Sequence, residues 1–173
     1  AMACGRPCGK TPDVRIAKSG DGVRIRLNMA ESHVLEALFN ELQESLVVGA
    51  LDPSDPVQRR LYPAGYDDAE DARSFRELTE SSLRQDRSDR VDQGLAELLS
   101  GRSLRRTEVT LDADGTQRWL RVLNDLRLMF GTRLGITEDD EYGLDETAPQ
   151  AQLRARYLWL TALQDLLVTT AMG

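Results

Sequence analysis

The sequence predicts a mainly α fold: a single-domain helical bundle of about five or six helices with a small β-hairpin or three-stranded sheet. Three observations lead to this prediction. Apolar residues recur at helical spacing over long segments, above all in residues 112–136. Two short segments near the N-terminus alternate apolar and polar residues, which is typical of half-buried strands. A chain of 173 residues, 40% of them hydrophobic, is long enough to bury one core.

The first twelve residues, AMACGRPCGKTP, show no apolar period and are rich in glycine and proline. We expect residues 1–12 to be a flexible N-terminal tail that carries a cysteine pair, and residues 13–173 to form one domain. Val14 and Ile16, and then Val23, Ile25 and Leu27, alternate with polar neighbours around Ser-Gly-Asp-Gly, a turn sequence. This pattern predicts a β-hairpin with one buried face.

The middle of the chain predicts helices. Asn28 is a good N-cap for a helix over about residues 30–48, and Pro56 suits the first turn of a short helix over about 55–61. Residues 67–100 are mostly helical in composition, and Gly101 is a stop signal. The centre of that segment, residues 84–90, is polar on all sides. It either faces water or marks a break between two helices.

The second half begins with a short β-type segment at 107–111, which we expect to pair with the hairpin. Asp112 then caps a long amphipathic helix, and Gly135 ends it. Shifted by 84 positions, the first strand, cap and helix align with this second set, although any such unit shows a similar pattern.

The last helix, at about 151–171, is apolar on more than one face, so it is either central in the core or shared with a partner chain. For the second case, a homodimer, the predicted interface consists of Tyr157, Trp159, Leu160 and Leu163.

The net charge and the hydropathy argue against two classes of function, nucleic-acid binding and membrane insertion. The net charge of -7 argues against direct nucleic-acid binding, which depends on Lys and Arg at phosphates, and is compatible with a basic protein partner. No apolar run approaches the roughly 20 residues that span a bilayer, and no apolar signal-peptide region opens the chain. We therefore expect a cytoplasmic protein without a membrane segment.

Cys4-Gly-Arg-Pro-Cys8 is the most reactive feature in the sequence. Gly5 and Pro7 favour a turn that would bring the sulfurs together, and the positive charges of Arg6 and Lys10 favour the thiolate. Such a pair suits a peroxide-responsive switch, in which one cysteine is oxidised and the other resolves it. The alternative is two idle thiols in a tail.

Other chemistry is not evident. His33 is the only histidine, and it has no second ligand in a metal-binding spacing. The acidic run at 137–146 does not follow the order of a calcium loop, and Gly131-Thr-Arg-Leu-Gly135 is not a phosphate loop. We expect neither an enzyme nor a bound cofactor.

Several phrases together resemble an actinobacterial domain-of-unknown-function family that includes the AosR-type oxidative-stress transcriptional regulator. They are LYPAGY at 61–66, FRELT at 75–79, WLRVLNDLRL at 119–128, GTRLGI at 131–136 and YLWL at 157–160. The resemblance covers about residues 23–170.

The resemblance implies a cytosolic, non-enzymatic regulator that senses oxidation through an intramolecular disulfide in a C-x3-C motif. Cys4 and Cys8 have that spacing. It also implies action with an alternative sigma factor of RNA polymerase on cysteine-biosynthesis genes, so residues 13–173 would form a regulatory domain. The alternative is a constitutive homo-oligomeric interaction module with no redox role.

Overall fold

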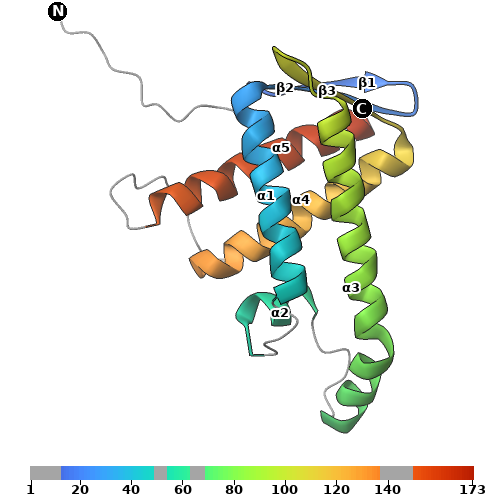
Figure 1. The fold of residues 1–173 in the computed structure, drawn as a ribbon, viewed down its shortest axis with the longest axis vertical. Coiled ribbons are helices and arrows are strands. Elements are labelled where there is room, and N and C mark those ends of the chain that lie inside the picture. The colour runs from blue at the N-terminus through green and yellow to red at the C-terminus, as the bar shows by residue number, and fades with distance from the viewer. Residues whose placement is uncertain (1–12, 49–53, 63–68, 137–149) are drawn as a thin grey trace, which may run out of the picture.

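The computed structural model describes residues 13–48, 54–62, 69–136 and 150–173 (Figure 1). In these ranges the elements are, in chain order, β1 (Arg15–Ser19), β2 (Gly22–Asn28), α1 (Met29–Val48), α2 (Pro56–Leu61), α3 (Ala69–Ser100), β3 (Arg106–Leu111), α4 (Ala113–Leu134) and α5 (Ala151–Met172). The mainly α prediction is confirmed, and the described part of the chain has five helices and three strands.

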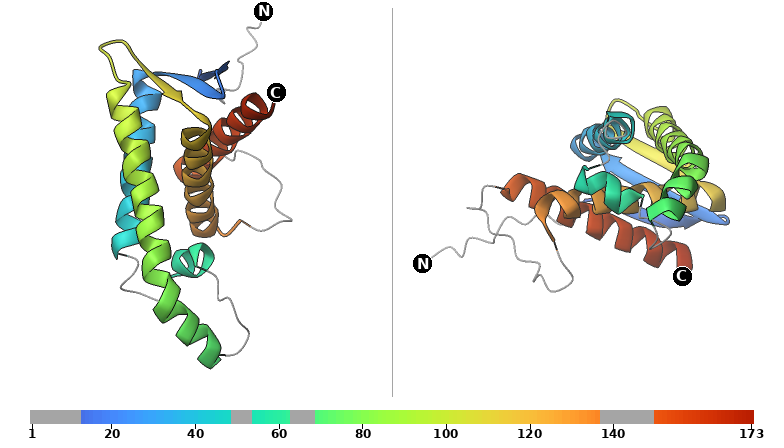
Figure 2. Two further views of the ribbon diagram at one scale, coloured as in Figure 1. Left: turned by 90° about the vertical axis from the view of Figure 1, so that its right-hand side faces the viewer. Right: turned by 90° about the horizontal axis from the view of Figure 1, so that it is seen from below.

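The three strands form one antiparallel sheet in the order β1-β2-β3. Ile16 lies opposite Ile25, and Ile25 lies opposite Val109, so the segment at 107–111 does pair with the hairpin as predicted. Val23, Ile25 and Leu27 are at most 2% exposed and form the inner face of the central strand. The sheet caps one end of the helices, which lie on its inner side only (Figures 1 and 2).

Both predicted N-caps are confirmed. The Asn28 side chain accepts a hydrogen bond from the Glu31 backbone N–H at 2.9 Å, and the Glu31 carboxylate accepts one from the Asn28 N–H at 3.0 Å. This reciprocal pair is a capping box. At the second helix, Asp112 accepts from the Gly115 N–H at 2.7 Å. The caps satisfy backbone donors that no helical carbonyl reaches, which starts α1 and α4 directly after their strands.

Two helical layers meet along α4: α1 and α3 form one layer, and α4 and α5 form the other (Figure 2). Trp119 is fully buried, and its ring meets that of Phe39 from α1 edge to face at 5.6 Å. The predicted stripe is buried with it at Val122, Leu123, Leu126, Met129 and Phe130, whereas its last member, Leu134, is only partly buried. The helix ends at Gly135, whose φ of 67° is left-handed and suits glycine.

Helix α3 continues through residues 84–90, so the alternative of a break there was wrong. Arg84 lies 4.5 Å over the ring of Tyr62 and donates to the Gln58 side chain at 2.9 Å. Arg87 donates to the Leu61 carbonyl at 2.9 Å. The polar segment therefore continues as a helix because its arginines contact α2.

Helix α5 packs along α4, and one stripe of it is buried: Tyr157, Leu160, Leu163 and Leu167. A Cβ on Gly131 would lie 3.3 Å from the Tyr157 ring, so this glycine allows the close approach of α5. None of the helices, within the described residues, offers a stretch that is both long and apolar enough to traverse a lipid bilayer.

Gly22→Ala tests how tightly the sheet joins α4. The added Cβ would lie 2.0 Å from the Leu111 carbonyl oxygen, which is backbone and cannot rotate away. We expect the free energy of unfolding to fall by about 1–3 kcal/mol in urea denaturation, as for other overpacked sites. Asp21→Ala, at the exposed neighbouring turn position, should change it by less than about 0.5 kcal/mol. Equal effects would contradict this packing.

Candidate functional site

The predicted redox pair, Cys4 and Cys8, lies outside the described residues, as does the acidic run at 137–146. The disulfide switch therefore stays a prediction. His33 is exposed on α1. Over the described ranges, no group of three or more His, Cys, Asp or Glu side chains is placed to hold a metal ion.

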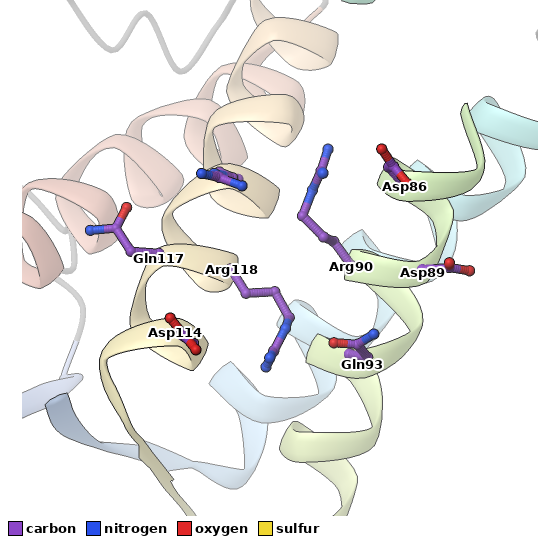
Figure 3. Close-up of a pocket in the computed structure, with 8 residues that line it drawn as sticks. Asp86, Asp89, Arg90, Gln93, Asp114, Gln117 and Arg118 are labelled. Carbon is purple, nitrogen blue, oxygen red and sulfur yellow. The ribbon is translucent and has the colours of Figure 1, made fainter. Parts of the chain in front are cut away.

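A polar groove between α3 and α4 is a candidate site that the folded body itself provides (Figure 3). It has a volume of about 470 Å³, and a second hollow of about 350 Å³ shares Arg90 and Arg121 with it. The lining of the two hollows is almost wholly polar: Asp86, Arg87, Asp89, Arg90, Gln93, Asp114, Gln117, Arg118, Leu120, Arg121, Asn124 and Asp125. Figure 3 shows that α3 and α4 face each other across it.

One wall contains a largely buried ion pair. Arg87 of α3 bonds through its guanidinium to Asp125 of α4, whose side chain is 8% exposed. Burial raises the pKa of Asp125, and the charge and hydrogen bond of Arg87 oppose this effect. Because Arg87 also donates to the Leu61 carbonyl, this contact joins α2, α3 and α4. It is a structural contact, since both groups are already satisfied.

A second ion pair, at the other end of the groove, also joins α3 to α4. Arg118 bonds to Glu97, and the same carboxylate accepts a hydrogen bond from the Trp119 ring nitrogen at 2.7 Å. The central tryptophan is thereby satisfied at its one polar atom. Like the Arg87–Asp125 pair, this contact holds α3 against α4.

Two arginines in the groove have guanidinium groups that the described residues leave open to a ligand. Within the described ranges, neither Arg90 nor Arg121 makes a hydrogen bond or ion pair through its guanidinium group. Arg90 acts on Asp125 only through its charge. Asp86, Asp89 and Asp114 balance these charges within the same groove. The groove can therefore hold polar groups of a ligand or partner, but its lining offers no cysteine, serine or histidine for covalent chemistry.

The sequence did not predict this groove. Its signal was the spacing of Arg84, Arg87 and Arg90, which repeats every three residues and places the guanidinium groups along one side of α3. The partners of Arg84 and Arg87 on α2 and α4 are 26 to 38 residues away, at positions that no local pattern identifies.

The predicted interface residues occupy different environments. Tyr157, Leu160 and Leu163 are at most 6% exposed within the chain's own core, whereas Trp159 is half-buried. Leu166, about two helical turns after Trp159, is 36% exposed. A homodimer through α5 stays a prediction, and Trp159 is the member of the set with surface left for a second copy.

Comparison with known proteins gives a family. Residues 13–171 match the model of a domain of unknown function, DUF2017. The chain is 26% identical over 215 residues to the oxidative stress regulator AosR of Mycobacterium bovis (strain ATCC BAA-935 / AF2122/97), covering 98% of this chain and 97% of that protein. AosR of Mycobacterium tuberculosis, strains CDC 1551 / Oshkosh and ATCC 25618 / H37Rv, gives the same values. No solved structure matches significantly.

The Arg87–Asp125 pair can be tested by a double-mutant cycle. Arg87→Met or Asp125→Leu alone should lower the free energy of unfolding by about 2–4 kcal/mol, because each leaves a largely buried charge without its partner. The double variant should lose less than the sum of the two. The more exposed Arg133–Glu41 pair is the control, with a coupling of about 0.5 kcal/mol. Equal coupling energies in urea denaturation would contradict a structural role for Asp125.

Proposed function

Because the chain belongs to the DUF2017 family, we propose that it is a non-enzymatic regulator of the oxidative stress response that acts through contact with a protein partner. The observation that carries this proposal is the similarity to AosR over nearly the full length of both chains. A cytoplasmic location is part of the proposal, since the partner would be the transcription machinery. An alternative sigma factor of RNA polymerase is the candidate partner.

The proposed switch is a reversible disulfide between Cys4 and Cys8. A peroxide oxidises the thiolate of one cysteine to a sulfenic acid and is itself reduced, releasing one oxygen atom as water. The thiol of the other cysteine then attacks the sulfenic sulfur, the S–S bond forms, and a second water leaves. Thiol reductants of the cell reverse the step by thiol–disulfide exchange.

The tail is attached where it can influence the folded body. Cys8 precedes Arg15, the first residue of β1, by seven positions. Seven extended residues span at most about 25 Å and the eleven from Cys4 at most about 40 Å, which bounds the distance of each sulfur atom from the start of β1. Oxidation therefore acts near the sheet, whereas the residues of the groove between α3 and α4 belong to other elements.

A second candidate function is a constitutive homo-oligomeric interaction module with no redox role. The half-buried Trp159 and the exposed Leu166 on α5 favour it. If α5 is the interface, Trp159→Asp should convert a dimer to a monomer in sedimentation velocity. Leu160→Glu is unsuitable for this test because Leu160 is fully buried in the core and its replacement would unfold the chain.

Mild peroxide treatment tests the switch. We expect the intact mass to fall by two hydrogens and peptide mapping to find an internal Cys4–Cys8 link, with Cys4→Ser as the control that forms none. Loss of two hydrogens without this link would contradict the proposal.

The coupling to a partner is tested separately. Capture from reduced and oxidised lysate should recover a transcription protein in only one state, and Cys4→Ser/Cys8→Ser should abolish the difference. A partner that binds this double variant with the same dependence on oxidation would rule out the cysteine pair as the switch.

A further inference from the structure

The outer face of the sheet is not covered by any helix of the described chain (Figures 1 and 2). Side chains alternate across a strand, so the residues that do not enter the core lie together on this face. We define the outer sheet face by these residues: Arg15, Ala17, Arg24, Arg26, Asn28, Arg106, Glu108 and Thr110. All of them are exposed except Glu108, which is half-buried.

Three of the four arginines on this face, Arg24, Arg26 and Arg106, surround one glutamate. The Glu108 carboxylate accepts a hydrogen bond from the Arg26 Nε at 2.7 Å, and it lies 3.7 Å from the Arg24 Nε and 4.0 Å from the Arg106 guanidinium. The hydrogen bond from Arg26 lowers the pKa of Glu108, so the carboxylate stays ionised. The face still has a surplus of three positive charges, in a chain whose net charge is -7.

Arg15 shows that this charge is not explained by folding alone. It lies directly opposite Arg26 on the neighbouring strand, and it makes no ion pair with any described residue. Like charges in directly opposite positions destabilise a sheet. Nor does the chain need arginines for solubility, because its net charge is already far from zero. The described residues therefore leave a surplus of positive charge on this face that is open to a ligand.

An exposed leucine stands at the edge of the face. Leu104 is 99% exposed, in the turn that leads into β3. The Ser103 backbone N–H and hydroxyl both donate to the Arg106 carbonyl, at 2.9 and 2.7 Å, which closes this turn. The leucine is thus held outward on an ordered support, next to the exposed Arg105. An apolar anchor beside arginines is the composition of a protein–protein interface.

We infer that the outer sheet face, with Leu104 at its edge, docks a segment of a protein partner that is rich in Asp and Glu and carries an apolar side chain. Guanidinium groups bind carboxylates through paired hydrogen bonds, which explains arginine rather than lysine at all four positions. The inference rests on the proposed function only for the existence of a protein partner, and it is independent of the cysteine switch.

Nucleic acid fits this face less well. None of its residues is aromatic, so bases have no ring on which to stack. The net charge of -7 also repels a polyanion as a whole, whereas a short acidic segment meets mainly the local field of the four arginines.

The test uses the full chain and a fluorescein-labelled peptide rich in Glu with two leucines, followed by fluorescence anisotropy at low salt. Arg15→Glu with Leu104→Ser should weaken binding roughly tenfold, because it reverses one charge and removes the anchor. Arg60→Glu with Leu83→Ser makes the same chemical changes at exposed positions of α2 and α3 and should leave the affinity within about twofold.

Arg15→Glu alone separates binding from folding. It replaces a like-charge pair across the strands by an attractive one, so the Tm should stay the same or rise while affinity for the peptide falls. Cys4→Ser/Cys8→Ser should bind the peptide as the parent chain does, which distinguishes failure of the switch from failure of the docking surface. Three results would overturn the inference: no binding by the parent chain, equal weakening in the control variant, or tighter binding of a DNA duplex than of the peptide.

Discussion

Burial of the apolar stripe of α4 is the constraint on which the rest of the structure depends. This helix contacts the other four helices and both β2 and β3. Each of these elements therefore packs its apolar residues against α4. Trp119 and Leu123 at its centre are fully buried, and burial of one such side chain contributes roughly 1.5–3 kcal/mol. Because Trp119 also donates to Glu97, the one polar side-chain atom of this buried ring is satisfied. Apolar packing and polar contacts therefore both hold α3 in the same position against α4.

The polar contacts around α4 hold the helices together and are not arranged as a reactive site. Arg87 with Asp125, and Arg118 with Glu97, join α3 to α4 at two points along the groove. The chemistry proposed for this chain lies outside these contacts: Cys4 and Cys8 precede β1 in the sequence, and the outer face of the sheet is open (Figure 1). A core joined by such contacts, with an open charged face on the sheet, suits a protein that acts by contact.

The sequence predicted correctly those features that depend only on residues close together in the chain. The alternation around Ile25, the caps at Asn28 and Asp112, and the stripe through Trp119 each need only a few neighbouring residues, and all four are confirmed. The continuity of α3 could not be predicted, since the partners of its arginines are on α2 and α4. The outer sheet face was missed for the same reason: Arg26 and Arg106 are 80 positions apart and meet around Glu108 only after β2 and β3 pair.

Hydrogen exchange of the reduced and peroxide-treated chain tests most directly whether oxidation changes the tail and the β-hairpin that follows it while α4 stays unchanged. We predict that differences in deuterium uptake are confined to peptides from residues 1–28, and that peptides from residues 113–134 exchange equally slowly in both states. Faster exchange of the α4 peptides on oxidation, or no difference anywhere in the chain, would contradict this prediction.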